Sequence, residues 1–201
     1  DEDRIIEEIA RLLEELLREL LELIKKLIET NRRLNEEHER AVRELARLGT
    51  DKALDDLERL HREINKRLED LVRELEKLVR EILKELKDAL EELRRASARA
   101  GGEEVLRRLE EIVKKLLDLV RRILERLKEI HKDNVRLLRE LNERLTRILG
   151  NADEEIRRMV KRLHEDLERK LKESEDELRE IEARLEEKIR RLEEKLERKR
   201  R

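Results

Sequence analysis

The residues of this chain best suited to chemistry are four histidines and the asparagines and threonines that accompany them. Their surroundings are almost wholly aliphatic or charged, and glutamine is absent, so every uncharged polar residue within a helix is exceptional. A neutral imidazole donates a hydrogen bond through one nitrogen and accepts one through the other, and an amide group does both. We predict that these residues form a buried polar network, whose members are His38, His61, His131, His164, Asn31, Asn35, Asn65, Asn134, Asn142, Thr30 and Thr146.

Metal, haem and catalytic chemistry fit these residues less well. A di-iron bundle needs Glu-x-x-His on two helices, and only Glu58 with His61 has that spacing. Zinc bound by His38, His61 and His164 is geometrically conceivable, but large Leu and Ile residues at the flanking core positions leave no room for haem. The sequence has no cysteine, no serine beside a histidine and no glycine-rich phosphate loop. We therefore predict no metal, no cofactor, no catalytic residue, no small-molecule substrate and no enzyme.

Glycine-bearing turns divide the chain into four segments of nearly equal length, and apolar residues recur within each at close to the helical period of about 3.6. That period, unlike the heptad repeat of about 3.5, does not force a left-handed supercoil. Short turns make successive helices antiparallel. The prediction is an all-α, antiparallel up-down-up-down four-helix bundle of long (about 47-residue), nearly straight helices. It forms a single domain over residues 1–201, with helices at about 3–48, 51–98, 103–149 and 152–199.

The turns carry the residues that end and begin helices. Gly49 and Gly150 stand where a left-handed cap residue is favoured. Thr50 or Asp51 can cap the second helix, and Asn151 has a glutamate three positions later, the capping-box pattern for the fourth.

This topology also brings the polar residues together. The turns at 49–51 and 150–152 lie at the same end of an up-down-up-down bundle, and all members of the predicted network fall in the part of each helix nearest to them. His38 precedes Gly49 by 11 residues and His61 follows it by 12, so we expect them at nearly the same level. His164 should lie close to that level and His131 deeper along the bundle.

Composition narrows the set of partners. The chain has 53 basic and 55 acidic residues, so its net charge of -2 creates no field that would gather nucleic acid or an anionic membrane. Charged residues interrupt every apolar stretch before the roughly 18 residues that a membrane span needs. We therefore expect neither partner. The 37% of hydrophobic residues, set at helical spacing, opposes disorder.

The first helix is richer in apolar residues than the fourth. Residues 5–28 include 14 apolar positions, whereas residues 156–181 include 8. We expect the first helix to lie centrally in a monomer. The alternative is a homodimer or designed assembly through an exposed apolar face of the first helix.

The whole chain resembles computationally designed helical bundles, especially those with buried histidine and asparagine hydrogen-bond networks. The resemblance lies in the glycine turns, the helix caps, the Glu/Lys/Arg surface and the absence of proline, cysteine and aromatic residues. It implies a thermostable structural scaffold or assembly building block with no natural activity or localisation, soluble in the cytoplasm of an expression host. One alternative is a pH-responsive bundle switched by protonation of the histidines; another is a histidine-based metal or haem binder.

Overall fold

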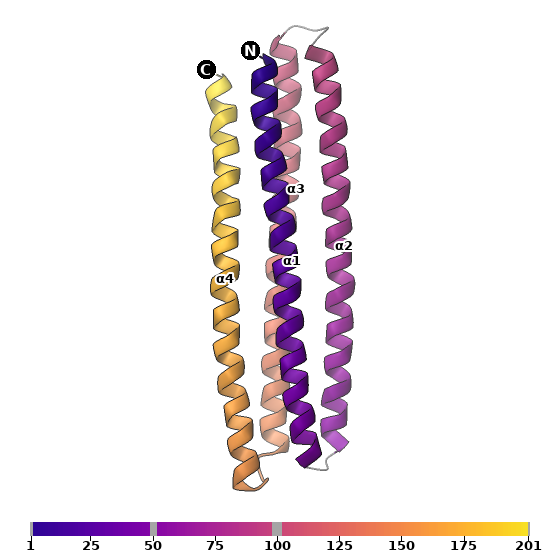
Figure 1. The fold of residues 1–201 in the computed structure, drawn as a ribbon, viewed down its shortest axis with the longest axis vertical. Coiled ribbons are helices and arrows are strands. Elements are labelled where there is room, and N and C mark those ends of the chain that lie inside the picture. The colour runs from indigo at the N-terminus through magenta and orange to yellow at the C-terminus, as the bar shows by residue number, and fades with distance from the viewer. Residues whose placement is uncertain (1, 49–51, 98–101, 201) are drawn as a thin grey trace. The chain divides into compact units, whose positions relative to one another are not determined.

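The computed structural model describes residues 2–48, 52–97 and 102–200 and confirms the predicted fold class. Within these ranges the secondary structure is helical, with no strand, and successive helices run in opposite directions (Figure 1). Each predicted boundary lies within two residues of the observed one. The helices are α1 (Glu2–Leu48), α2 (Lys52–Ser97), α3 (Gly102–Ile148) and α4 (Glu154–Arg200).

The fourth helix begins with a different cap from the one predicted. The Asp153 carboxylate accepts a hydrogen bond from the backbone N–H of Ile156 at 3.0 Å, and α4 starts at Glu154. Asp153 is therefore the N-cap, and the capping box expected from Asn151 is wrong. Asn and Asp are both favoured as N-cap residues. The turn after Gly150 is two residues longer than predicted, so the cap is Asp153 and not Asn151.

Gly150 does not take the left-handed conformation that was predicted, since no described glycine has a positive φ. A Cβ atom at this position would lie 3.2 Å from the carbonyl oxygen of Thr146. Close approach of the backbone, rather than backbone handedness, is thus what glycine provides here. The caps predicted at Gly49, Thr50 and Asp51 lie outside the described residues.

The internal contacts divide the chain into two compact units, and each contains a segment of all four helices. Unit 1 comprises residues 1–24, 73–126 and 179–201; unit 2 comprises residues 25–72 and 127–178. That residues 1–201 form a single domain stays a prediction.

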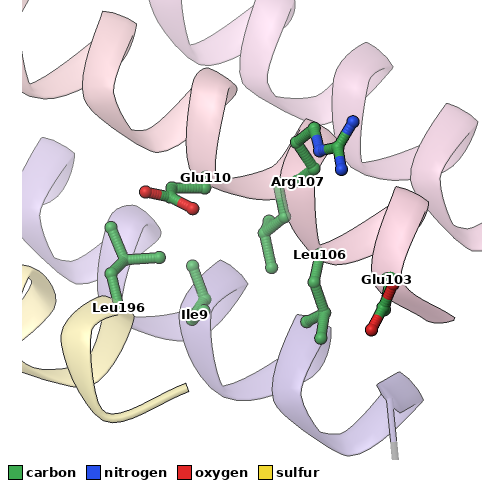
Figure 2. A pocket seen from close by; sticks show the side chains of 7 residues that line it. Ile9, Glu103, Leu106, Arg107, Glu110 and Leu196 are labelled. Carbon is green, nitrogen blue, oxygen red and sulfur yellow. The ribbon is translucent and has the colours of Figure 1, made fainter. Parts of the chain in front are cut away.

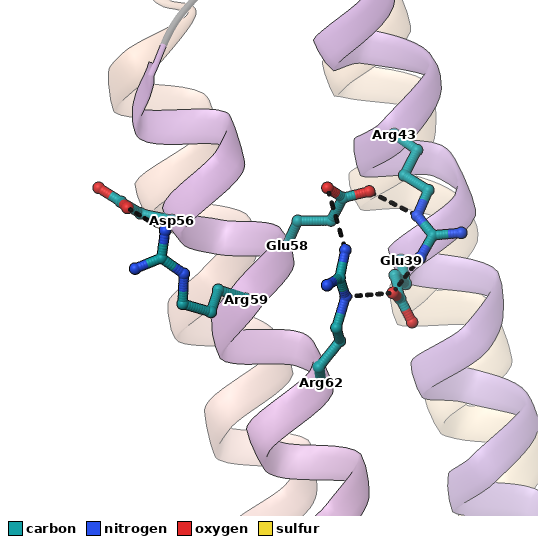
Figure 3. Close-up of polar contacts among 6 residues, drawn as sticks. All are labelled: Glu39, Arg43, Asp56, Glu58, Arg59 and Arg62. Carbon is teal, nitrogen blue, oxygen red and sulfur yellow. Dashed lines mark hydrogen bonds and ion pairs between the residues drawn. The ribbon is translucent and has the colours of Figure 1, made fainter.

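In unit 2, ion pairs show how the helices run. Arg43 contacts Glu58, and Arg62, one turn further along α2, contacts Glu39, one turn earlier on α1 (Figure 3). Rising numbers on α1 therefore meet falling numbers on α2, which makes the two helices antiparallel. These contacts show the relative direction of α1 and α2. They add little to the stability of the fold, because exposed ion pairs contribute only about 0–1 kcal/mol each.

Unit 1 has the same polarity between its first and fourth helices. Glu8 pairs with Lys195 at 3.7 Å, and Glu19, further along α1, pairs with Lys188 at 2.8 Å. The up-down arrangement therefore holds for this pair of segments too.

Aliphatic side chains fill the interior of each unit. In unit 2 the buried aliphatic residues form two separate clusters. The first lies nearest the 149–153 turn, and the second consists of Leu34, Leu138, Leu167 and Leu171. The members of the first cluster are Val42, Leu45, Leu57, Ile64, Leu141, Leu145, Leu149 and Val160. In unit 1 the fully buried side chains include Ile9, Leu16, Leu20, Val79, Val113, Val120, Leu185 and Leu192.

The first helix does not expose the apolar strip considered for self-association. Ile6, Leu13 and Leu17 are each 1% exposed and Ile24 is fully covered, so the extra apolar residues of α1 enter the core. Among the described residues the large hydrophobic side chain that stands exposed is Leu78 of α2, at 47%. The wide apolar arc of α1 is therefore explained by burial within the fold.

We expect this fold to be highly stable to heat. Each buried aliphatic side chain contributes about 1.5–3 kcal/mol, and local helix preference agrees with the tertiary fold because proline is absent. Helical circular dichroism should persist above about 90 °C at neutral pH, and a cooperative transition below about 60 °C would contradict this. A second circular dichroism scan, recorded on cooling, is the control: it should retrace the heating scan if unfolding is reversible.

Candidate functional site

Polar side chains from all four helices meet inside unit 2 in two hydrogen-bonded groups. The first joins α1 to α3 around Asn31. The Asn31 carbonyl oxygen accepts hydrogen bonds from His131 Nδ1 at 3.0 Å and from the Asn134 amide at 2.9 Å, while the Asn31 amide donates to the Leu27 carbonyl at 2.9 Å. Asn35 donates to the Asn134 carbonyl oxygen at 3.1 Å. Asn31 is therefore the centre of this group, with three hydrogen bonds.

The second group is a chain that runs through the four helices in the order α2, α1, α3, α4. His61 Nε2 lies 2.6 Å from His38 Nδ1, and His38 Nε2 lies 3.2 Å from the Asn142 carbonyl oxygen. The Asn142 amide lies 2.8 Å from His164 Nδ1. Thr146 also contacts Asn142, because its hydroxyl donates to the backbone carbonyl of that residue at 2.9 Å.

The amide of Asn142 determines which nitrogens of this chain carry protons. Its oxygen can only accept, so His38 must donate from Nε2, and the Nδ1 atom of neutral His38 must then accept. His61 therefore donates from Nε2, which leaves its Nδ1 as an acceptor. At the other end the Asn142 NH₂ group donates to His164. All donors point the same way, from α2 towards α4.

The structure separates the predicted members by burial. Buried members are Thr30, Asn31, Asn35, His38, His61, His131, Asn134 and Asn142. Asn65 is half-buried, and both His164 and Thr146 are exposed. Ser174 is also buried, 3% exposed, and its hydroxyl donates to the Lys170 carbonyl at 2.8 Å, although it is not one of the predicted members.

Burial acts on the protonation of three histidines. Burial, together with a smaller electrostatic effect of the neighbouring His38, lowers the pKa of His61 to about 3. Burial also lowers the pKa of His38, although the hydrogen bond with Asn142 opposes the shift. The pKa of His131 is lowered by burial against the opposing effect of the Glu175 carboxylate. Near neutral pH these imidazoles are therefore uncharged, as the tautomer chain requires.

Several acceptors of the network have no protein donor within the described residues. They are His61 Nδ1, His131 Nε2 and the side-chain oxygens of Asn35 and Asn65. The described residues contain no group of three or more His, Cys, Asp or Glu side chains placed to hold a metal ion. The network thus provides directed hydrogen bonds between helices, and we expect these bonds to specify the register of the helices more than they add stability.

A second candidate site lies in unit 1, in a groove between α3 and α4. Its first pocket, of ≈ 360 Å³, has Ile9 of α1, Leu106 of α3 and Leu196 of α4 around one space (Figure 2). A second pocket of ≈ 350 Å³ adjoins it, since Glu110 and Leu196 line both. We refer to these two pockets together as the α3/α4 groove.

The α3/α4 groove has an apolar floor and a predominantly acidic border. Its carboxylates are Glu103, Glu110, Asp118, Glu193 and Glu197, and its cations are Arg107, Lys114 and Arg121. Two of the carboxylates are engaged, because Glu110 pairs with Lys114 at 3.2 Å and Glu193 pairs with Arg121. The remaining charges give the groove a negative potential.

Sequence reasoning did not find this groove, although a signal for it exists. The last part of α4 has a single row of apolar residues, Leu185, Ile189, Leu192 and Leu196. On α3 a second row, which includes Leu106 and Leu117, widens the apolar stripe on the side of α4. A narrow stripe opposite a wide one leaves part of the wide stripe uncovered.

Comparison with known proteins gives one finding about identity. Residues 49–122 match the model of a family described as ING, inhibitor of growth proteins N-terminal histone-binding. The match includes the whole of α2 and the first part of α3, a little more than a third of the chain. No protein of curated function matches the chain.

This match corrects the functional interpretation of the sequence. The prediction of a designed scaffold without natural activity is wrong, because the matched family is a natural one defined by histone binding. The two alternatives within that prediction, a pH-responsive bundle and a histidine-based metal or haem binder, are contradicted with it. Glycine turns, helix caps and a Glu/Lys/Arg surface indicate long helices, and natural helical proteins share them.

The predictions on partners and localisation are corrected by the same finding. We predicted a monomer without a nucleic-acid partner, with self-association through the first helix as the alternative, and this prediction conflicts with the match to a histone-binding family. The expectation of no natural localisation, with the chain in the cytoplasm of an expression host, is also wrong. In the described part of the chain, no helix is long and apolar enough to cross a membrane.

Proposed function

We propose that this chain is a non-catalytic binding module for histones. The observation that carries the proposal is the match of residues 49–122 to a histone-binding family model. Histones are strongly basic proteins, so a surface that binds them needs carboxylates that are free to form ion pairs. Because histones occur in chromatin, the proposed place of action is chromatin.

The exposed side of α2, which also lies in the matched segment, does not meet this need. Glu74, Glu81 and Glu85 are exposed there, but exposed cations lie among them: Arg73, Lys77, Arg80 and Lys84. Within the described residues none of the three glutamates forms an ion pair.

The matched segment supplies such carboxylates at the α3 border of the α3/α4 groove, which runs from Glu103 to Arg121. Opposite charges across an interface accelerate encounter and select partners more than they raise affinity. A helical framework suits that task, since it holds the carboxylates in place before the partner arrives. We assign to the polar network the supporting role of fixing the register of the helices in unit 2.

The test is a direct binding measurement with the full chain. Purified core histones should bind saturably in isothermal titration calorimetry at an ionic strength of about 0.15 M, where exposed charges are screened beyond about 8 Å. Polylysine of matched charge is the control, because it reproduces the charge of a histone without its apolar side chains. We expect clearly weaker binding to polylysine. Absence of saturable histone binding, or equal binding to polylysine, would refute the proposed function.

A further inference from the structure

We infer that the α3/α4 groove of unit 1 is the docking site for a basic segment of the histone, with an apolar side chain of that segment inserted above Ile9, Leu106 and Leu196. This inference rests on the proposed function and specifies where and how the partner binds. It commits to a lysine- or arginine-bearing peptide segment as the occupant.

The floor of the groove provides the apolar part of the site. Ile9 and Leu109 are almost fully covered, whereas Leu106 and Leu196 remain partly accessible beside them. The volume of ≈ 360 Å³ lies near the lower end of the range of about 300–1,000 Å³ found for ligand pockets. Burial of an apolar side chain there removes both its surface and that of the two leucines from water.

The border of the groove selects a basic occupant. Glu103, Asp118 and Glu197 form no ion pair in the part of the chain that the structure describes, while Arg107 is the one lining cation without a pair there. Three free carboxylates against one free cation leave a net negative charge beside an apolar floor. A segment with cationic side chains on either side of an apolar one is complementary to both features.

A neighbouring hollow in the same unit shows that this charge excess is local. The pocket between α1 and α4 is lined by Glu7, Glu8 and Glu15 and by an equal number of cations, Arg4, Arg11 and Lys195. Glu8 is already paired with Lys195 and Glu7 with Arg94. That pocket therefore has no preference for a basic segment.

The exposed carboxylates of α2 lack the apolar floor and provide a matched comparison. The variant Glu103→Lys/Asp118→Lys/Glu197→Lys reverses the charge of the groove. The control variant Glu74→Lys/Glu81→Lys/Glu85→Lys makes the same change in net charge on the outer side of α2, within the same unit. Circular dichroism and sedimentation velocity establish that both variants keep the helical content and association state of the parent protein.

The experiment is a titration of each protein with core histones. The groove variant should bind at least about tenfold more weakly, since three favourable contacts become repulsive, while the control should change by less than about threefold. Equal loss in both variants would mean that the binding follows net charge alone, and unchanged binding by the groove variant would place the histone elsewhere. Either result overturns the groove assignment and leaves the histone-binding function standing. Failure of the parent protein to bind histones would instead overturn the function itself.

A measurement on the unaltered protein keeps the test independent of variant folding. Methyl resonances of Leu106 and Leu196 should shift on addition of histone, whereas those of Leu12, in the charge-balanced pocket, should not. Uniform shifts would contradict the assignment. Self-association of the parent protein without histone, seen by sedimentation and lost in the groove variant, would identify a second copy of the chain as the occupant and also overturn it.

Discussion

Lowering the pH from about 7.5 to about 4.5 is expected to remove several kcal/mol from the free energy of unfolding of this protein. The cause is the burial of His38, His61 and His131, which lowers the pKa of each below the value of about 6.5 that histidine has in an unfolded chain. As the pH falls, the unfolded chain takes up protons on these residues before the folded protein does. The free energy of unfolding therefore has its full value, as far as these three histidines are concerned, above about pH 6.5 and declines below that pH.

The decline continues down to the pKa of each group in the folded protein. For His61, with a folded pKa of about 3, the loss is about 1.4 kcal/mol per pH unit and reaches about 3 kcal/mol by pH 4.5. Protonation of both His38 and His61 is opposed further, because the two rings lie within hydrogen-bonding distance, 2.6 Å between nitrogens. The first proton on this pair makes the second more costly.

Chemical denaturation at the two pH values measures this effect. In a His61→Asn variant the difference in unfolding free energy between the two conditions should shrink by about 3 kcal/mol, the share of His61. Surface carboxylates are common to both proteins and cancel from the comparison. Ser174→Ala is the matched control, since Ser174 is buried and polar but does not titrate. An unchanged pH difference in the His61 variant would show that His61 is solvated in the folded protein.

The sequence predicted the fold and much of the polar network because both depend on periodicity. Distance from the turn fixed the level of each helical residue, which is why His38 and His61, counted from Gly49, meet in the structure. The same counting placed His164 at their level, and it does contact Asn142. Level along a helix follows from the rise per residue, which hardly varies.

Orientation around the helix was harder to predict, and there the sequence misled. His164 was expected inside but is exposed, because α4 has a narrow apolar stripe and His164 lies at its edge. The α3/α4 groove escaped notice for a related reason. It results from a mismatch between the stripes of two helices, and neither stripe alone reveals which side will remain uncovered.

Function was the least accessible property. Burial patterns specify which side chains are inside, and almost any Glu, Lys or Arg is compatible with an outer position. A surface such as that formed by Glu103, Asp118 and Glu197 therefore leaves little trace in periodicity. The choice of partner rests on the arrangement of charges that the fold itself does not require.

Asn31→Leu should be among the most damaging single substitutions in unit 2. Asn31 is fully buried, and its oxygen accepts from both His131 and Asn134. Leucine would fill a similar volume but leave two donors inside the protein without a partner, at about 1–3 kcal/mol each. We expect the free energy of unfolding to fall by about 2–5 kcal/mol in guanidinium titrations at neutral pH.

Two further variants separate a lost network from a lost contact. Asn35→Leu removes one partner of Asn134, so it should cost less, about 1–3 kcal/mol. Replacing Asn31, Asn35, His131 and Asn134 together by leucine or isoleucine should restore or exceed the parent stability, because no buried polar group is then left unpaired. That recovery is what distinguishes a network that specifies helix register from one that holds the helices together. If the fourfold variant were less stable than Asn31→Leu, the hydrogen bonds around Asn31 would be net stabilising, and their role would be to support the fold rather than to select its register.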